Sequence, residues 1–389
     1  MRSTLTFLVI LFAVNCFGQQ YSQKYSDLQY VSDGQVYHKL DIYLPKVSKS
    51  KYPVVIYIYG SAFLSNNSKG TDMNTIGAAL LDAGFAVVTP NHRSSSDALY
   101  PAQIQDIKAV VRFIRGASGT YKLDTSFVGI SGSSSGGQLA SLAGTTRNVK
   151  SFTRNGITMD LEGSLGNHTA QISSVDAVCD WFGPTDFLKM DSCGGSIFNN
   201  NAADSPASKL IGGEIQKNKD KSQMTNPITY VDPSDPPFLI IHGTTDNVVP
   251  YCESQFLDRA LTRSGVSSQF ITVPNGGHGG GVTISNANLN AMVQFFSNRL
   301  SVVTSTESGL EVDNNESVYF FSNENELVIR LLDYLQASEY ELFDISGRKI
   351  ASGPVNKSEY TFSLSGKGMY VFKAHMKNGN IITRKILVN

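Results

Sequence analysis

Hydrophobic residues along the chain predict buried strands that alternate with amphipathic helices. Continuous apolar runs rich in β-branched residues are typical of strands buried on both faces of a sheet. Such runs predict strands at 54–59, 85–90, 126–131, 175–182, 237–242 and 269–273. Helical spacing predicts helices at 76–83, 102–115, 254–264 and 289–300, and another that begins at Gly137. The alternation indicates an α/β fold, a mostly parallel sheet covered by helices on both faces.

Two other regions alternate apolar and polar residues, as half-exposed strands do. Residues 26–45 predict an edge hairpin around a turn at Asp33-Gly34. The segment 303–317 is polar and without period, and we expect it to be a linker. Beyond it, runs at 340–345, 369–374 and 381–388, with a hairpin turn at Asn378-Gly379, predict a small all-β sandwich at 318–389.

The first 18 residues have the features of an export signal. Arg2 supplies a positive charge, Leu5–Val14 is almost wholly apolar, and Cys16 and Gly18 suit a cleavage site after Gly18. The run is too short for a permanent membrane span, and a buried N-terminal helix is the alternative. The main domain is therefore expected at 19–302, with no permanent membrane span. The whole chain has a formal net charge of −1 and no Lys/Arg run, which argues against a nucleic-acid partner.

A nucleophile motif lies between the predicted strand at 126–131 and the helix that follows. Gly132-Ser133-Ser134-Ser135-Gly136 matches G-x-S-x-G, in which a serine protrudes from a tight strand-to-helix turn. Ser134 has glycines two residues before and two after it, so we expect it to be the nucleophile. The Ser135 amide would then point at the developing oxyanion.

A serine hydroxyl needs a base and an orienting acid. Six histidines are present, and His278 lies in a glycine-rich loop after the last strand, where an imidazole can reach another strand's turn. Asp246 follows the strand at 237–242 and lies between the serine and the histidine in the chain order typical of this fold. Glu253 is the second candidate for the acid. His242, at the end of that strand, is interpreted as structural.

The cysteines leave the redox state open. Removal of Cys16 with the signal would leave Cys179, Cys193 and Cys252. An odd number in an exported protein suggests one disulfide and one spare thiol. Cys193 and Cys252 lie in loop-like contexts and could pair, and three unpaired cysteines are the alternative. No spacing typical of a metal site occurs, and we expect neither a metal nor a cofactor.

Five motifs together resemble the secreted bacterial carbohydrate esterases of the α/β-hydrolase superfamily, acetylxylan- and feruloyl-esterase-like enzymes related to hormone-sensitive lipase. They are Tyr59–Phe63, Gly132–Gly137, Trp181–Asp186, Pro237–His242 with Asp246, and Gly277–Gly279. The resemblance covers about residues 25–300. It implies an eight-stranded sheet and cofactor-free hydrolysis of acyl esters on plant polysaccharide, by Ser134, Asp246 and His278.

The resemblance also implies an oxyanion hole formed by the amides of Ser61, Ala62 and Ser135. The family's usual His-Gly-Gly-Gly loop is here Tyr59-Gly60-Ser61-Ala62, and the amides can point inward if residues 61 and 62 have negative φ. Trp181 is a candidate to stack on a sugar or a ferulate, with a role as a core aromatic as the alternative.

The C-terminal region resembles the sorting domain of the Bacteroidetes type IX secretion system. The resemblance rests on the segments 340–350, 368–371 and 384–388, while Ser322–Asn325 stands where an Asn-Pro element is usual. It implies that the type IX secretion machinery is a partner and that the protein is secreted or exposed at the cell surface.

Three functions remain open from the sequence. The first is an esterase that acts on acylated carbohydrate or on a small ester. The second is a serine peptidase or arylformamidase on the same scaffold, because a triad does not distinguish an ester from an amide. The third is a non-catalytic surface binding protein with a vestigial triad.

Overall fold

The computed structural model describes residues 20–307, 318–323, 326–331, 337–357, 359–364, 368–379 and 381–388. The predicted signal peptide and residues 308–317 of the predicted linker lie outside these ranges. The chain divides between Ser308 and Gly309 into two compact units.

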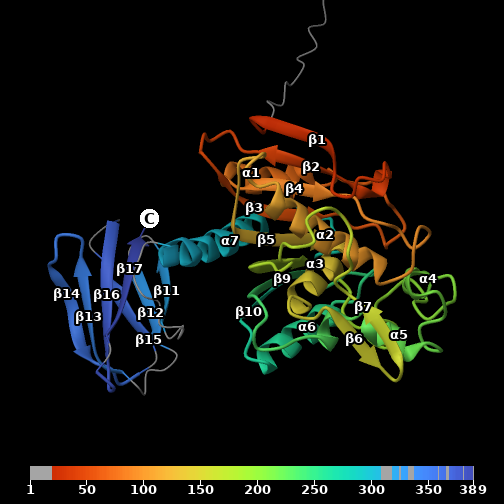
Figure 1. The fold of residues 1–389 in the computed structure, drawn as a ribbon. Coiled ribbons are helices and arrows are strands. Elements are labelled where there is room, and N and C mark those ends of the chain that lie inside the picture. Colours follow the sequence, from red (N-terminus) through yellow and green to blue (C-terminus); the bar gives the residue numbers. More distant parts are fainter. Residues whose placement is uncertain are drawn as a thin grey trace, which may run out of the picture. The chain divides into compact units, whose positions relative to one another are not determined.

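The first unit is built on one eight-stranded sheet in the order β1-β2-β4-β3-β5-β8-β9-β10 (Figure 1). Its strands are β1 (Gln23–Gln29), β2 (Lys39–Leu44), β3 (Tyr52–Ile58), β4 (Ala86–Pro90), β5 (Leu123–Ser133), β8 (Ala177–Trp181), β9 (Phe238–Gly243) and β10 (Ser268–Val273). The pairs from β4 to β10 are parallel, whereas β2 is antiparallel to both of its neighbours. The predicted α/β fold with a mostly parallel sheet is confirmed.

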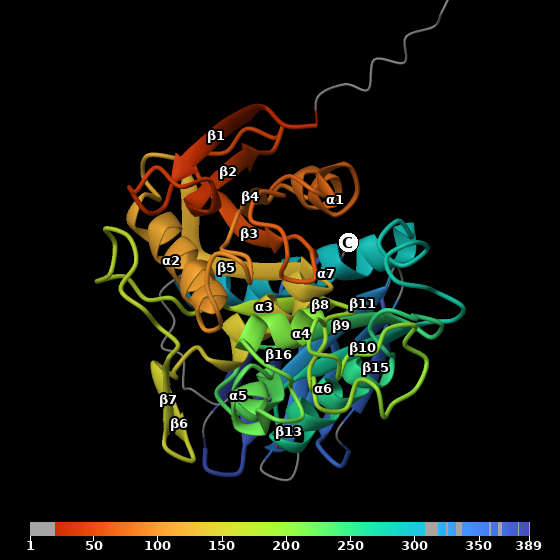
Figure 2. The ribbon, with the colours of Figure 1, turned by 90° about the vertical axis from the view of Figure 1, so that its right-hand side faces the viewer.

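Helices cover both faces of this sheet (Figure 2). They are α1 (Ala78–Asp82), α2 (Ala102–Gly116), α3 (Ser135–Thr145), α6 (Cys252–Arg263) and α7 (Asn286–Glu307), with short turns η1 (Val36–His38), η2 (Met73–Gly77) and η3 (Pro227–Thr229). One apolar core joins the sheet to α2, α3 and α6, and a second joins it to α1 and α7. Among the residues with a described placement, no helix is both long and apolar enough to cross a membrane.

Three features differ from the prediction. β2 is not half exposed, because it lies between β1 and β4 and five of its six residues are buried. α7 continues to Glu307, into the predicted linker, because no Gly or Pro lies between Asn286 and Gly309. The polar segments 146–174 and 189–226, in which the sequence pattern predicts no element, contain regular structure: the hairpin β6 (Ser151–Arg154) and β7 (Ile157–Asp160), and helices α4 (Pro206–Ile211) and α5 (Lys219–Met224).

The second unit is the predicted all-β sandwich. One sheet has the order β11-β12-β15 and the other has the order β14-β13-β16-β17. The strands are β11 (Val318–Asn323), β12 (Glu326–Leu331), β13 (Ala337–Asp344), β14 (Lys349–Pro354), β15 (Glu359–Ser363), β16 (Gly368–Met376) and β17 (Ile381–Val388). Ile329 of β12 and Phe372 of β16 are fully buried in one apolar core, so the two sheets pack face to face.

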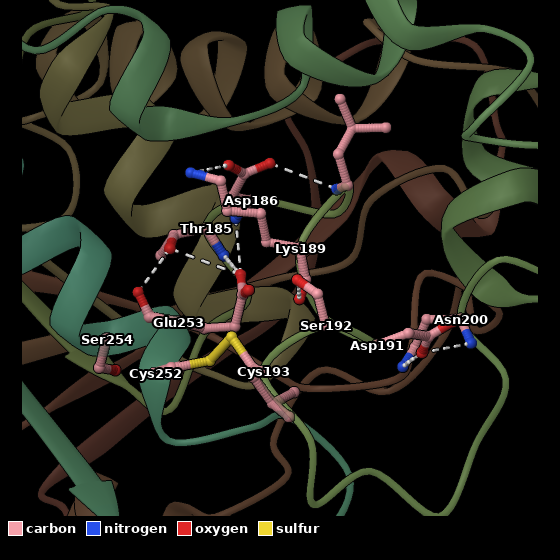
Figure 3. Close-up of a disulfide and its surroundings, with 12 residues drawn as sticks. Thr185, Asp186, Lys189, Asp191, Ser192, Cys193, Asn200, Cys252, Glu253 and Ser254 are labelled. Atoms are coloured by element: carbon pink, nitrogen blue, oxygen red, sulfur yellow. Dashed lines mark hydrogen bonds and ion pairs between the residues drawn. A yellow bond between two sulfur atoms is a disulfide. The ribbon is translucent and has the colours of Figure 1, made fainter.

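A disulfide joins Cys193, in the loop after β8, to Cys252, the first residue of α6 (Figure 3). It closes a loop with a sequence separation of 59 residues. Cys179 on β8 is a buried free thiol. Of the two arrangements that the sequence leaves open, the structure contains the one with a single disulfide.

Reduction of this disulfide is expected to destabilise the first unit. A closed loop of this length restricts the unfolded chain by an amount worth about 4 kcal/mol. Urea unfolding with and without a reductant measures the difference. A Cys193→Ser/Cys252→Ser protein should have the same free energy of unfolding as the reduced wild type, and the reductant should not change it. Equal stability of the oxidised and reduced wild type would contradict the expectation.

Candidate active site

The turn between β5 and α3 presents Ser134. The residue has φ 54° and ψ −124° and is the N-cap of α3, while its N–H donates to the Trp181 carbonyl at 2.9 Å. The turn closes only around glycines: a Cβ on Gly132 would lie 2.2 Å from the Gly136 carbonyl oxygen, and a Cβ on Gly136 would lie 2.2 Å from the Ile58 carbonyl oxygen. These contacts are the physical reason for the G-x-S-x-G spacing.

The glycine-rich loop after β10 brings His278 to this serine. His278 Nε2 lies 3.1 Å from Ser134 Oγ. The Gly276 carbonyl oxygen accepts hydrogen bonds from the amide and the hydroxyl of Thr245, which tie this loop to the one after β9. The Phe182 ring packs edge-on against the imidazole at 4.8 Å. The position of the imidazole is therefore restricted both by its loop and by the Phe182 ring.

Asp246 lies on the other side of the imidazole. Its Oδ2 is 2.8 Å from His278 Nδ1, and its Oδ1 accepts from the amides of Val248 and Val249. Burial raises the pKa of this carboxyl, but hydrogen bonds from His242 and His278 lower it more, so its pKa falls well below the ordinary range. The ionised carboxylate places the ring proton on Nδ1 and leaves Nε2 free to accept from Ser134.

His242 also contacts the Asp246 carboxylate, although the sequence predicts only a structural role for this histidine. It is fully buried, with Nε2 at 3.3 Å from Asp246 Oδ2 and at 3.0 Å from the Val249 carbonyl oxygen. The Ser254 hydroxyl lies 2.7 Å from its Nδ1. Asp246 thus has an imidazole on each side. The spacing of four residues between His242 and Asp246 after a buried strand was the available signal.

The three predicted oxyanion donors lie together but are not equivalent. The Ser61 amide donates to the Ser135 hydroxyl at 2.9 Å. Within the described ranges, the amides of Ala62 and Ser135 have no hydrogen-bond partner. Ala62 has φ 52°, so the condition of a negative φ is not met at this position, where the chain reverses sharply after β3. The geometry leaves Ala62 and Ser135 as the two free donors.

Trp181 does not reach a substrate. Its ring is fully buried in the core between the sheet and α7, and its Nε1 donates to Ser131 Oγ at 3.1 Å. The substrate-stacking hypothesis was therefore wrong. β8 lies in the middle of the sheet, so both of its faces are covered and a side chain of this size fills the core.

Glu253, the second candidate for the acid, is placed elsewhere. Its Oε2 accepts from the amides of Thr185 and Asp186 at 2.7 and 2.6 Å, beside the disulfide (Figure 3). Its carboxylate and the sulfurs of Cys193 and Cys252 are close enough together to share a metal ion. The sulfurs are bonded to each other and do not offer the thiolates that a metal would need.

Ser134 and His278 open into a cavity of about 300 Å³. Its lining is Gly60, Ser61, Ala62, Asp72, Ser133, Ser134, Phe182, Val248, His278, Gly279 and Thr283. None of these residues belongs to the polar segments 146–174 and 189–226, so these segments do not line the cavity. Ser134, His278 and the Ala62 amide lie at this cavity, with Asp246 hydrogen-bonded to His278 and the Ser135 amide next to Ser134 in the chain. Together these groups are the components of acyl transfer.

The family model BD-FAE matches residues 40–261. Esterase LipC of Mycobacterium tuberculosis is 27% identical over 244 residues, which are 62% of this chain and 56% of that protein. Esterase LipQ of the same organism is 25% identical over 67% of this chain and 58% of its own length. The chain thus spans less than two thirds of these two relatives.

Two solved structures are more similar in sequence. A truncated form of a carbohydrate esterase from gut microbiota is 45% identical, with a TM-score of 0.70, over 72% of this chain and 98% of that chain. A bifunctional GH43-CE protein of Bacteroides eggerthii is 49% identical, with a TM-score of 0.68, over 71% of this chain and 38% of that chain. Both matches agree with the predicted α/β-hydrolase fold of an ester hydrolase.

Glu253 is expected to make the stability of the fold depend on pH. Burial raises its pKa to about 8, from 4.5 in the unfolded chain. Between these values the folded protein keeps a proton that the unfolded chain releases, so the free energy of unfolding falls as the pH rises, by roughly 1 kcal/mol per pH unit. Glu253→Gln keeps an oxygen for the two amides and has no proton to lose.

Urea unfolding of both proteins at pH 5, 6.5 and 8 isolates this contribution. Other buried carboxyls contribute equally to both proteins, so only the difference between them counts. The variant should gain stability relative to the wild type as the pH rises. A constant difference across the three values would show that Glu253 does not titrate in this window.

Proposed function

This chain belongs to the BD-FAE family, and we propose that it is a carboxylic ester hydrolase with Ser134 as nucleophile, His278 as general base and Asp246 as orienting acid. The observation that carries the proposal is the continuous hydrogen-bonded series from Ser134 Oγ through His278 to Asp246 Oδ2. Such a series recurs on unrelated folds wherever a serine hydroxyl is activated.

The reaction has two halves. In the first, the Ser134 hydroxyl gives its proton to His278 Nε2 and its Oγ attacks the ester carbonyl carbon. The Ala62 and Ser135 amides and the amino end of α3 stabilise the oxyanion. The alcohol leaves with the proton from His278, and an acyl-serine remains. In the second half, His278 takes a proton from water, the hydroxide attacks the acyl carbon, and Ser134 leaves with that proton as the acid is released.

The proposed substrate is an acetylated or feruloylated plant polysaccharide. The sequence identity of 45% to a carbohydrate esterase from gut microbiota supports a carbohydrate as the alcohol component of the ester. The cavity of about 300 Å³ is at the small end of ligand pockets, which favours the short acetyl group over the feruloyl group.

We also propose export for this chain. Its support is the N-terminal signal-like sequence, the disulfide between Cys193 and Cys252, and the sandwich at 318–388, which resembles a type IX sorting domain. Disulfides persist in oxidising compartments outside the cytosol.

Acyl release measured for wild type and Ser134→Ala tests the proposal. The wild type should release acetate from acetylated xylan faster than ferulate from methyl ferulate, and should cleave 4-nitrophenyl acetate. Loss of the nucleophile should reduce every rate by about 10⁴-fold or more. Circular dichroism of the variant serves as the control for folding.

The remaining outcomes separate the alternatives. Turnover of peptide or formamide substrates, without ester turnover, would favour the amide hydrolase. A wild type without turnover whose Ser134→Ala variant still binds xylan would indicate a binding protein. Equal rates for wild type and variant would show that Ser134 is not the nucleophile.

A further inference from the structure

Asp72 places a carboxylate in the wall of the cavity that holds Ser134 and His278. The residue precedes η2 and has φ 60° and ψ 12°. Its carbonyl oxygen accepts from the amides of Thr75 and Gly77 at 3.1 Å each. The backbone at this point is therefore held in place, and the carboxylate has a defined position.

One oxygen of the Asp72 carboxylate accepts a hydrogen bond from the Tyr57 hydroxyl. The phenol oxygen lies 2.6 Å from Asp72 Oδ2 and 3.0 Å from Ser133 Oγ. Burial and the Asp72 charge raise the pKa of Tyr57 well above its usual value, so the phenol keeps its proton. A carboxylate can only accept, so the single phenolic proton goes to Asp72, and the Ser133 hydroxyl donates to Tyr57.

The other oxygen, Asp72 Oδ1, is free. In the described part of the chain it has no hydrogen bond, and no Lys or Arg forms an ion pair with this carboxylate. The described lining of the cavity also contains no Lys or Arg. The site thus presents an acceptor with an uncompensated negative charge, beside a reaction that itself develops negative charge on an oxyanion.

We propose that Asp72 is a substrate-binding residue that accepts a hydrogen bond from a free sugar hydroxyl near the scissile ester. The inference rests on the proposed carbohydrate-ester function and specifies what recognises the alcohol. A neutral, hydroxyl-rich group is the partner that fits, because its O–H donates to a carboxylate in a charge-assisted hydrogen bond. The same charge disfavours anionic groups at this point.

The test compares two esters that differ in hydroxyl groups. Acetylated xylobiose has free hydroxyls beside the ester, and 4-nitrophenyl acetate has none. Asp72→Asn removes the charge with little change in volume, and Asn also tolerates positive φ. Loss of a hydrogen bond to a charged group should lower kcat/KM for the sugar ester by roughly 10- to 100-fold. The rate with 4-nitrophenyl acetate should change by less than about threefold, a margin well below that loss.

Two further variants keep the result interpretable. Asp82→Asn, at an exposed position at the end of α1, is the matched control and should leave both rates unchanged. Tyr57→Phe removes the hydroxyl that holds Asp72 and should reproduce a smaller loss that is selective for the sugar ester. Thermal unfolding shows whether each variant is folded.

Each outcome decides the inference. A loss by Asp72→Asn on the sugar ester alone supports it. Equal losses on both esters would assign Asp72 to the shape of the site, and no loss on either would remove it from recognition. Equal losses, or no loss, would overturn the inference and leave the proposed function standing. A wild type that cleaves only 4-nitrophenyl acetate would overturn the carbohydrate function and, with it, this role for Asp72.

Discussion

The backbone turn at Ser134 is the constraint on which the site depends. A positive φ at a residue other than glycine is unfavourable by about 1–3 kcal/mol and persists only where the surroundings enforce it. Here Gly132 and Gly136 allow β3, β5 and α3 to approach within distances that no side chain would permit. A Cβ on Gly60 would also lie 2.7 Å from the Ser133 carbonyl oxygen. The same close packing therefore fixes the position of Ser134, the proposed nucleophile, and begins the loop that carries Ala62, one of the two proposed oxyanion donors.

The positions of Asp246 and His278, the proposed acid and base, depend on the adjacent part of the sheet. His278 lies on a loop tied to the turn after β9, and Asp246 on that turn is fixed by two amides and by His242. The disulfide and Glu253 connect the beginning of α6, just after this turn, to the loop after β8. Both residues that are proposed to act with Ser134 are thus held by the surrounding structure, as preorganised catalysis would require.

The sequence predicted what depends on local pattern. Strands buried on both faces and the strand-to-helix motif follow from residues close in the chain. The choice of Asp246 and His278 used the order of serine, acid and base that is typical of this fold. The role of His242, the positive φ of Ala62 and the hydrogen bond between Ser61 and Ser135 depend on loops that meet only in the folded protein. The regular structure in the polar segments before β9 was missed because its elements are only four to six residues long, too short to show a period.

Covalent labelling distinguishes Ser134 from the serines on either side of it. A reactive phosphonate ester mimics the tetrahedral intermediate and bonds to an activated serine. Peptide mass spectrometry of the labelled protein should locate one adduct per chain on Ser134, and Ser134→Ala should remain unlabelled. An adduct on Ser133 or Ser135, or a wild type that remains unlabelled, would contradict the account.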